Sequence, residues 1–220
     1  MLTWLENNYI SLIISFIFVM IYILNILLKN RVYSLFCYYS YPKKKKEIYR
    51  LFSSLFIHFG LFTHLIPNII GFISVFSVLS LYISSWKILI LFCLGFVPRM
   101  LQYFDDMQEY RKEKLLGAHN KINTIYGGSS LSIYLMIGVF IILFFFLPKP
   151  DNFYFYRVDV ILSVTYFIIG NLDITSIYNK ETKRKKLFIS YSFRGGVHFV
   201  SLVVGILIAF ILSFTSFFSL

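Results

Sequence analysis

The chain has few cysteines and few charged side chains, and each shortage excludes a class of protein. Its 220 residues contain two cysteines, Cys37 and Cys93, which are too few and too scattered for a disulfide framework or a metal site. Charged residues account for only 14% of the chain, whereas 58% of it is hydrophobic and the mean hydropathy is +0.75. This composition is too apolar for a soluble domain with a polar exterior, so we expect a membrane protein.

Acidic residues are also scarce, which leaves a strong positive balance. There are 21 Lys and Arg against 10 Asp and Glu, and the net charge is +11. The positive charges gather in short clusters between apolar runs, as loop charges do near lipid headgroups. No nucleic-acid recognition motif accompanies them. We therefore predict contact between the basic loops and anionic membrane lipids, and no nucleic-acid partner.

Six apolar runs approach the length of about 20 residues that a helix needs to cross the hydrocarbon core. They predict an all-α polytopic membrane protein, organised as a single six-helix domain over residues 1–220. The first run lacks a preceding Lys or Arg and a small-residue cleavage site, so we interpret it as a retained span and not as a signal peptide. The predicted spans are 9–28, 55–80, 87–104, 128–147, 156–172 and 196–217.

The positive charges are divided unequally between the two ends of this bundle. The connections 29–50, 99–127 and 180–194 hold seven, five and six Lys or Arg, whereas the alternate connections hold three between them. The positive-inside rule predicts that the three basic connections face the cytoplasm and that both termini lie on the other side.

Two polar side chains lie near the starts of the fourth and sixth spans. His198 begins the last run, and an ionisable side chain in a membrane helix is costly enough to indicate a function. Ser130 begins the fourth run, which crosses in the same direction, so both side chains lie at the same membrane face. Gly138 and Gly205 follow them at helical spacing and allow the two helices to approach closely. We therefore predict that Ser130 and His198 are in contact.

The second span supplies further polar groups at that face. His64 and Asn68 are four residues apart, so they share one side of the helix. An imidazole that takes the proton of a serine hydroxyl makes that serine a usable nucleophile. The Ser130 backbone N–H and the His64 and Asn68 side chains would then donate to the oxyanion, and Tyr134 is placed to stack on the imidazole. The pattern favours peptide-bond chemistry inside a bilayer.

Four segments of the chain resemble, in order and spacing, the rhomboid family of intramembrane serine proteases. Residues 49–60, YRLFSSLFIHFG, are similar to the Trp-Arg start of the family's second helix, and Gly128-Ser129-Ser130 resembles its Gly-x-Ser nucleophile motif. With Ser130 as the nucleophile, a stacking Tyr and a packing Gly follow at the family's positions. The resemblance covers residues 47–217. The residues that carry it are Tyr49, Arg50, His58, His64, Asn68, Gly128, Ser130, Tyr134, Gly138, His198, Ser201 and Gly205.

The resemblance implies a rhomboid-like bundle and a protease that cuts transmembrane proteins with a Ser130–His198 dyad. No metal or organic cofactor is implied. Family members open their site on the extracytoplasmic side, where this chain has its basic connections, so loop charge and resemblance predict opposite orientations. The residues expected to support the oxyanion and the base are His64, Asn68, Tyr134 and Gly128. The residues expected to be structural are Tyr49, Arg50, His58, Gly138 and Gly205.

Departures from the family pattern motivate an alternative. Leu131 stands where the family has a glycine after the nucleophile, and the spacing from His58 to His64 is one residue longer than usual. Pro67 falls within the second span, where we expect a kink. The alternative is a catalytically inactive rhomboid-like protein that binds or chaperones transmembrane helices. A small transporter or channel is a third hypothesis, although the paired broken helices typical of such folds are missing.

Overall fold

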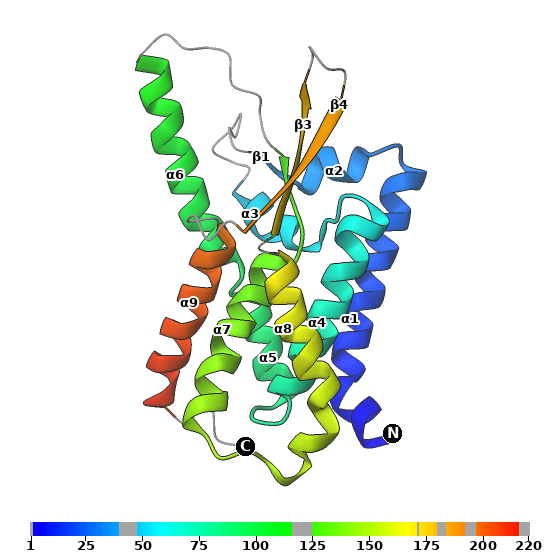
Figure 1. Cartoon of the computed structure of the whole chain (residues 1–220), viewed down its shortest axis with the longest axis vertical. Helices are drawn as coiled ribbons and strands as arrows, with labels where there is room; N and C mark the ends of the chain where they lie inside the picture. Colours follow the sequence, from blue (N-terminus) through cyan, green and yellow to red (C-terminus); the bar gives the residue numbers. More distant parts are fainter. Residues whose placement is uncertain are drawn as a thin grey trace.

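A bundle of long helices forms the body of the protein, with short helical turns and two small β-ladders at its upper end (Figure 1). The structure is a computed structural model that describes residues 2–39, 48–115, 125–170, 172–179, 184–191 and 197–215. The basic run 43–46, predicted to contact lipid, lies outside these residues. The α-helices are α1 (Leu2–Leu27), α2 (Arg31–Phe36), α3 (Tyr49–Ser53), α4 (Ile66–Leu79), α5 (Ser85–Cys93), α6 (Phe96–Leu115), α7 (Ser130–Phe146), α8 (Arg157–Gly170) and α9 (Val197–Ser213). The shorter turns are η2 (Ser54–Phe56), η3 (Leu61–Leu65) and η4 (Asp151–Tyr156).

Each range predicted as a span contains a helix, although the ends differ. In the described part of the chain, the stretches long and apolar enough to cross a membrane are Trp4–Leu27, Leu61–Leu79 and Ser85–Asp105. Shorter apolar helices cover Ser130–Phe146 and His198–Ser213. α8 has 14 residues and extends about 21 Å, less than the hydrocarbon thickness of about 30 Å. That all six helices cross the bilayer stays a prediction.

The predicted third span, 87–104, is divided into two helices. α5 ends at Cys93 and α6 begins at Phe96. A Cβ on the intervening Gly95 would overlap the backbone and side chain of Ser132 in α7, so the glycine lets the two backbones meet. α6 continues to Leu115 and rises beyond the bundle (Figure 1). α6 extends beyond the predicted end of the apolar run at residue 104, because its last turns are rich in Glu, Lys, Arg and Gln. These residue types favour helix without requiring burial.

α7 occupies the centre of the bundle, where it packs against α4, α5, α8 and α9. All residues from 131 to 140 are buried, as expected for a helix that is apolar on every side. α1 packs against α4 and buries Phe18 against Phe72 and Phe92. The N-terminal helix is therefore part of the core.

A pair of glycines sets the separation between α7 and α9. A Cβ on Gly138 would overlap the Leu202 carbonyl oxygen, and one on Gly205 would overlap the backbone of Leu135. The helices consequently meet backbone to backbone, which only residues without side chains allow. The contact lies about two turns after Ser130 on α7 and two turns after His198 on α9, so it determines how closely those residues approach.

Tyr49 and Arg50 hold the first connection in place. Arg50 Nη1 donates to the carbonyl oxygens of Ser34 (2.7 Å) and Cys37 (3.1 Å), and the Tyr49 hydroxyl donates to the Leu35 carbonyl (2.8 Å). These oxygens belong to the end of α2, where helix carbonyls lack partners within the helix. Both side chains therefore tie α3 to α2.

Two antiparallel β-ladders, which the sequence patterns did not predict, lie in the connections. β1 (Tyr38–Tyr39) pairs with β2 (Ile125–Tyr126), and β3 (Leu172–Asn179) pairs along its whole length with β4 (Arg184–Tyr191). The all-α description holds for the bundle, and the ladders are additions at its upper end (Figure 1). The first ladder places the chain just before Gly127 against the α2–α3 connection, and so helps to position the start of α7.

Candidate active site

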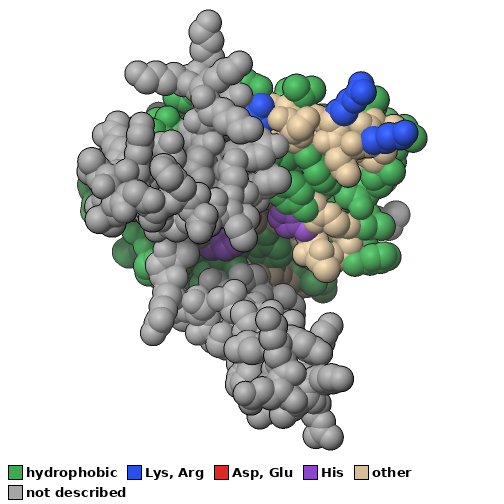
Figure 2. Space-filling view, turned by 90° about the horizontal axis from the view of Figure 1, so that it is seen from above, with side chains coloured by type: hydrophobic (Ala, Val, Ile, Leu, Met, Phe, Trp, Pro, Cys, Tyr) green, Lys and Arg blue, Asp and Glu red, His purple; other side chains and the backbone are tan. Residues whose placement is uncertain are grey.

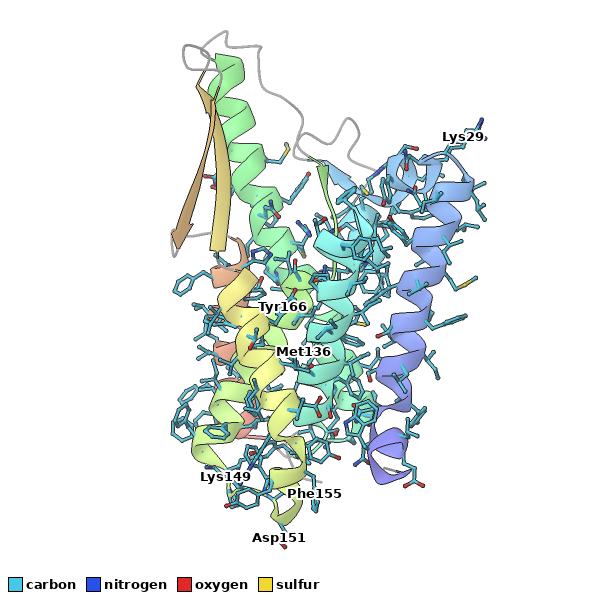
Figure 3. All side chains as sticks on the ribbon, turned by 45° about the vertical axis from the view of Figure 1, so that its right-hand side comes forward. Lys29, Met136, Lys149, Asp151, Phe155 and Tyr166 are labelled. Atoms are coloured by element: carbon cyan, nitrogen blue, oxygen red, sulfur yellow. The ribbon has the colours of Figure 1, made fainter. Side chains whose placement is uncertain are left out.

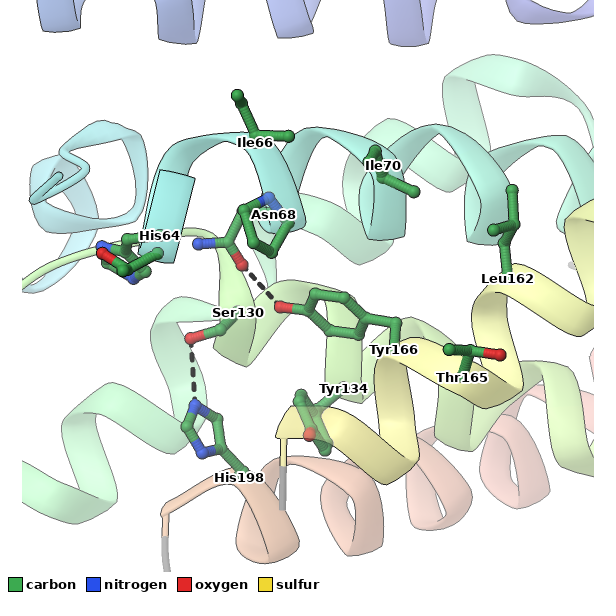
Figure 4. A pocket seen from close by; sticks show the side chains of 12 residues that line it. His64, Ile66, Asn68, Ile70, Ser130, Tyr134, Leu162, Thr165, Tyr166 and His198 are labelled. Atoms are coloured by element: carbon green, nitrogen blue, oxygen red, sulfur yellow. Dashed lines mark hydrogen bonds between the residues drawn. The ribbon is translucent and has the colours of Figure 1, made fainter. Parts of the chain in front are cut away.

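The structure brings Ser130 and His198 together at the upper end of the bundle. Ser130 is the first residue of α7 and His198 lies in the first turn of α9. His198 Nε2 is 3.0 Å from Ser130 Oγ (Figure 4). This is a hydrogen-bond distance, and it is the geometry in which an imidazole takes a proton from a hydroxyl. Figure 2, seen from this end, shows histidine side chains reaching the surface and basic side chains toward its edge.

Tyr134 holds the imidazole from one side. Its ring stacks on that of His198, with centroids 4.8 Å apart and planes inclined by 30°. The Tyr134 hydroxyl donates to the Phe167 carbonyl of α8 at 3.2 Å, so the ring is itself restrained. Stacking between two restrained rings limits the rotamers of His198 without adding charge.

The neighbouring Ser129 has a different partner. Its Oγ is 3.1 Å from His58 Nε2, and its backbone N–H donates to the same nitrogen at 3.3 Å. Both residues are buried, with exposed fractions of 0% for Ser129 and 1% for His58. Tyr33 donates its hydroxyl to the His58 carbonyl. His58 therefore anchors the start of α7 to the preceding connection, and only Ser130 of the two serines faces open space.

The extra residue between His58 and His64 is accommodated by a π-helical turn, η3. The Leu65 N–H donates to the Gly60 carbonyl, five residues earlier, at 3.0 Å. Such a turn contains more residues than an α-helical turn, so the insertion is absorbed locally. Pro67 follows in the first turn of α4, directly after η3, and η3 and α4 together form one helical stretch, Leu61–Leu79. The kink expected at Pro67 stays a prediction.

His64 and Asn68 present donors on the side of Ser130. His64 Nδ1 accepts the Phe59 N–H at 3.0 Å, so in the neutral ring Nε2 carries the proton. Asn68 is 2% exposed, and its Nδ2 has no hydrogen-bond partner among the described residues. Figure 4 shows this nitrogen directed toward His64 and Ser130. A buried amide donor left open is costly, which indicates a site that an acceptor occupies.

Gly128 keeps the space beside these donors empty. Its φ is 105°, a conformation that favours glycine. A Cβ at this position would overlap the His64 imidazole at Nε2 and would lie 3.4 Å from Asn68 Nδ2. The missing side chain therefore leaves room at the point where both donors converge, two residues before Ser130.

These groups line a cavity of about 520 Å³ between α4 and α8. Its wall is largely aliphatic and aromatic, with hydroxyl, amide and imidazole groups at one end (Figure 4). Leu131 is 1% exposed and is not among the lining residues, so it does not crowd the cavity. The lining residues are Thr63, His64, Ile66, Pro67, Asn68, Ile70, Ser130, Tyr134, Leu162, Thr165, Tyr166 and His198.

Tyr166 is the site residue that sequence reasoning missed. It lies on α8, and its hydroxyl donates to Asn68 Oδ1 at 2.5 Å. Its position within an apolar span was the available signal, but the chain contains 17 tyrosines, so the residue type did not distinguish it. Only the packing of α8 on α4 brings this hydroxyl to the amide.

The fold and the site together define an integral membrane protein with several helices in the bilayer. A family model described as Rhomboid domain matches residues 45–215. The chain therefore belongs to the rhomboid family, whose members are generally serine proteases acting on transmembrane substrates, although inactive members exist. The match begins after α1 and α2. No curated protein matches the chain.

Proposed function

We propose that this protein is an intramembrane serine protease that cleaves transmembrane proteins with Ser130 as nucleophile and His198 as general base. The observation that carries the proposal is the 3.0 Å separation of His198 Nε2 from Ser130 Oγ at the wall of a cavity. Membership of the rhomboid family supports it.

Ser130 Oγ attacks the carbonyl carbon of the scissile peptide bond while His198 Nε2 takes the hydroxyl proton. The carbonyl oxygen then carries the negative charge of the tetrahedral intermediate. The C–N bond breaks, and His198 gives its proton to the leaving amine. Water, deprotonated in turn by His198, hydrolyses the remaining ester and restores the Ser130 hydroxyl.

Three groups would stabilise the oxyanion. Asn68 Nδ2 and His64 Nε2 meet beside Gly128. The Ser130 N–H is at the start of α7, where backbone donors have no partner within the helix. One such donor contributes about 10²–10³-fold to the rate in serine proteases, because it is already oriented when charge develops.

Labelling with a fluorophosphonate probe tests the proposal without a known substrate. Detergent-purified parent protein should be labelled, whereas Ser130→Ala and His198→Ala should not. Ser129→Ala is the matched control, because that serine is adjacent in sequence but paired with buried His58. It should keep its labelling even if its thermal stability falls. Labelling that survives Ser130→Ala, or is lost only in Ser129→Ala, contradicts the assignment.

A folded parent that takes no label would favour the alternative of an inactive rhomboid-like protein that binds transmembrane helices. The activity to measure would then be co-purification of a transmembrane helix, unaffected by Ser130→Ala. Leu131 motivated this alternative, but its side chain lies outside the cavity lining, so we favour the protease.

A further inference from the structure

The side-chain amide of Asn68 ends in an oxygen and a nitrogen, which are similar in size but opposite in hydrogen-bonding role. Its Oδ1 accepts a hydrogen bond, and its Nδ2 donates. In this structure Tyr166 donates its hydroxyl to Oδ1 at 2.5 Å, and Nδ2, which has no hydrogen-bond partner in the described part of the chain, is directed toward Ser130 (Figure 4). A hydroxyl that is hydrogen-bonded to an amide oxygen selects one of the two orientations that the side chain would otherwise share.

We propose that Tyr166 is a positioning residue that keeps the Asn68 amide nitrogen directed at the oxyanion. This inference rests on the proposed protease function. Without the Tyr166 hydroxyl, the amide could turn by half a rotation about its last bond and present Oδ1 to the developing negative charge. An acceptor facing an oxyanion repels it, so the turned population would be inactive.

The ring of Tyr166 is itself fixed by a glycine of α4. A Cβ added to Gly71 would lie 2.5–2.8 Å from ring atoms of Tyr166, closer than real contacts allow. Gly71 is three residues after Asn68, on the same side of the helix. The absent side chain thus forms the hollow that lets the Tyr166 hydroxyl reach the amide. Figure 3 places Tyr166 in the upper half of the bundle, far from Lys149 and Asp151 at the other end.

Tyr166 also lies near His198, the proposed base. An effect of a Tyr166 substitution on the Asn68 amide must therefore be separated from an effect on His198. Its ring is 5.8 Å from that of Tyr134, which stacks on His198. A substitution that keeps the ring and removes only the hydroxyl leaves this contact in place. Tyr166→Phe is therefore the informative variant.

The rate constant and the apparent affinity for a fluorophosphonate probe should be measured in a double-mutant cycle with Asn68→Ala. Tyr166→Phe should lower the inactivation rate constant about tenfold, the effect of one net hydrogen bond, without changing the apparent affinity. In the Asn68→Ala background, the same change should have no further effect, because the hydroxyl acts only through that amide. Equal effects in both backgrounds, or none in the parent, overturn the proposal.

Tyr156→Phe is the matched control. Tyr156 precedes α8, is 4% exposed, and its hydroxyl accepts a hydrogen bond from Asn7 at 3.2 Å, at the opposite end of the bundle. It should lower thermal stability about as much as Tyr166→Phe but leave labelling unchanged. Gly71→Ala should reduce labelling in the parent and not in Asn68→Ala, since it displaces the ring that carries the hydroxyl.

Nuclear magnetic resonance of the Asn68 side-chain amide tests the positioning itself. With ¹⁵N-labelled asparagine and Asn68→Ala for assignment, Tyr166→Phe should shift or broaden the Asn68 amide signals, and Tyr156→Phe should not. Coincident signals in the parent and Tyr166→Phe would refute the positioning role even in an active enzyme. A parent that takes no label but shows the shift would refute the protease function and leave the contact established.

Discussion

α8 meets α4 through a polar cluster near each of its ends, and the two clusters differ in whether their donors are satisfied. In the lower cluster, Trp4 Nε1 donates to Ser77 Oγ at 3.0 Å and Ser77 Oγ donates to Asp159 Oδ2 at 2.9 Å. Asn8 Nδ2 donates to Ser77 Oγ (3.2 Å) and to the Trp4 carbonyl (2.9 Å). These donors are directed at acceptors within the cluster.

The upper cluster contains a similar amide but uses it differently. Asn68 accepts a hydrogen bond from Tyr166 and leaves its nitrogen open at a cavity. The Asn8 amide joins α1 to α4. The Asn68 amide instead has its oxygen bonded to Tyr166 and its nitrogen without a partner among the described residues. A polar side chain in a membrane helix is therefore not evidence of a site by itself. The open donor beside a nucleophile is the distinguishing feature.

Exchanging the two amides for alanine gives the largest contrast. Asn68→Ala should reduce the fluorophosphonate labelling rate about 10²–10³-fold, and it should also cost some stability because the Tyr166 hydroxyl loses its acceptor. Asn8→Ala should lower stability and leave the labelling rate of the folded protein unchanged. An unchanged labelling rate in folded Asn68→Ala, or an equally reduced rate in folded Asn8→Ala, would contradict this difference between the two amides.

Gly205→Val should lower both the labelling rate and the stability of the fold. The added side chain meets the backbone of Leu135, so α9 must move away from α7 and carry His198 from Ser130. We expect a loss of about 1–3 kcal/mol in the free energy of unfolding, as for other overpacked positions, together with loss of labelling. Labelling at the parent rate, together with a lowered unfolding temperature, would mean that the close contact of α7 and α9 at Gly138 and Gly205 does not set the distance between Ser130 and His198.

Asp159→Ala should reduce stability alone. It leaves the Ser77 hydroxyl without its acceptor, which costs about 1–3 kcal/mol, whereas the Trp4 N–H keeps its bond to Ser77 Oγ. Asp159 is two turns from Tyr166, and among the described residues the two share no hydrogen-bond partner, so the labelling rate of the folded fraction should be unchanged. Denaturant titration and labelling of the same samples provide the measurement. A reduced rate in folded protein would indicate coupling between the two ends of α8.

The smallest expected effect concerns Cys37, whose thiol should not react with maleimide in the folded protein. Burial raises the pKa of the Cys37 thiol to about 12, although the Arg50 and Arg99 guanidiniums oppose this. In a Cys93→Ala background, folded protein at pH 8 should resist maleimide and denatured protein should react. An unfolded thiol titrates near pH 8.5, so the folded state keeps a proton that the unfolded state loses, and stability should fall as pH rises above 8.5. Rapid native labelling would contradict this burial.

Sequence patterns identified the apolar helices and the positions of Ser130 and His198, because helix direction alone places the starts of the fourth and sixth spans at one face. They also indicated the glycine seam, since small residues at helical spacing allow close approach. They did not indicate the break at Gly95 or the β-ladders, which depend on contacts between distant segments. They did not indicate the π turn before Pro67 either, because it is a local rearrangement that residue types do not specify.

The sequence by itself determined that this protein lies in a membrane, that its helices are apolar, and that a serine and a histidine share one end of the bundle. These properties follow from hydropathy and helical periodicity, which are local. Only the tertiary structure decided that Ser129 pairs with His58 while Ser130 faces the cavity, and that Tyr166 holds the oxygen of Asn68. Those choices depend on where separate helices touch, and that is a property of packing.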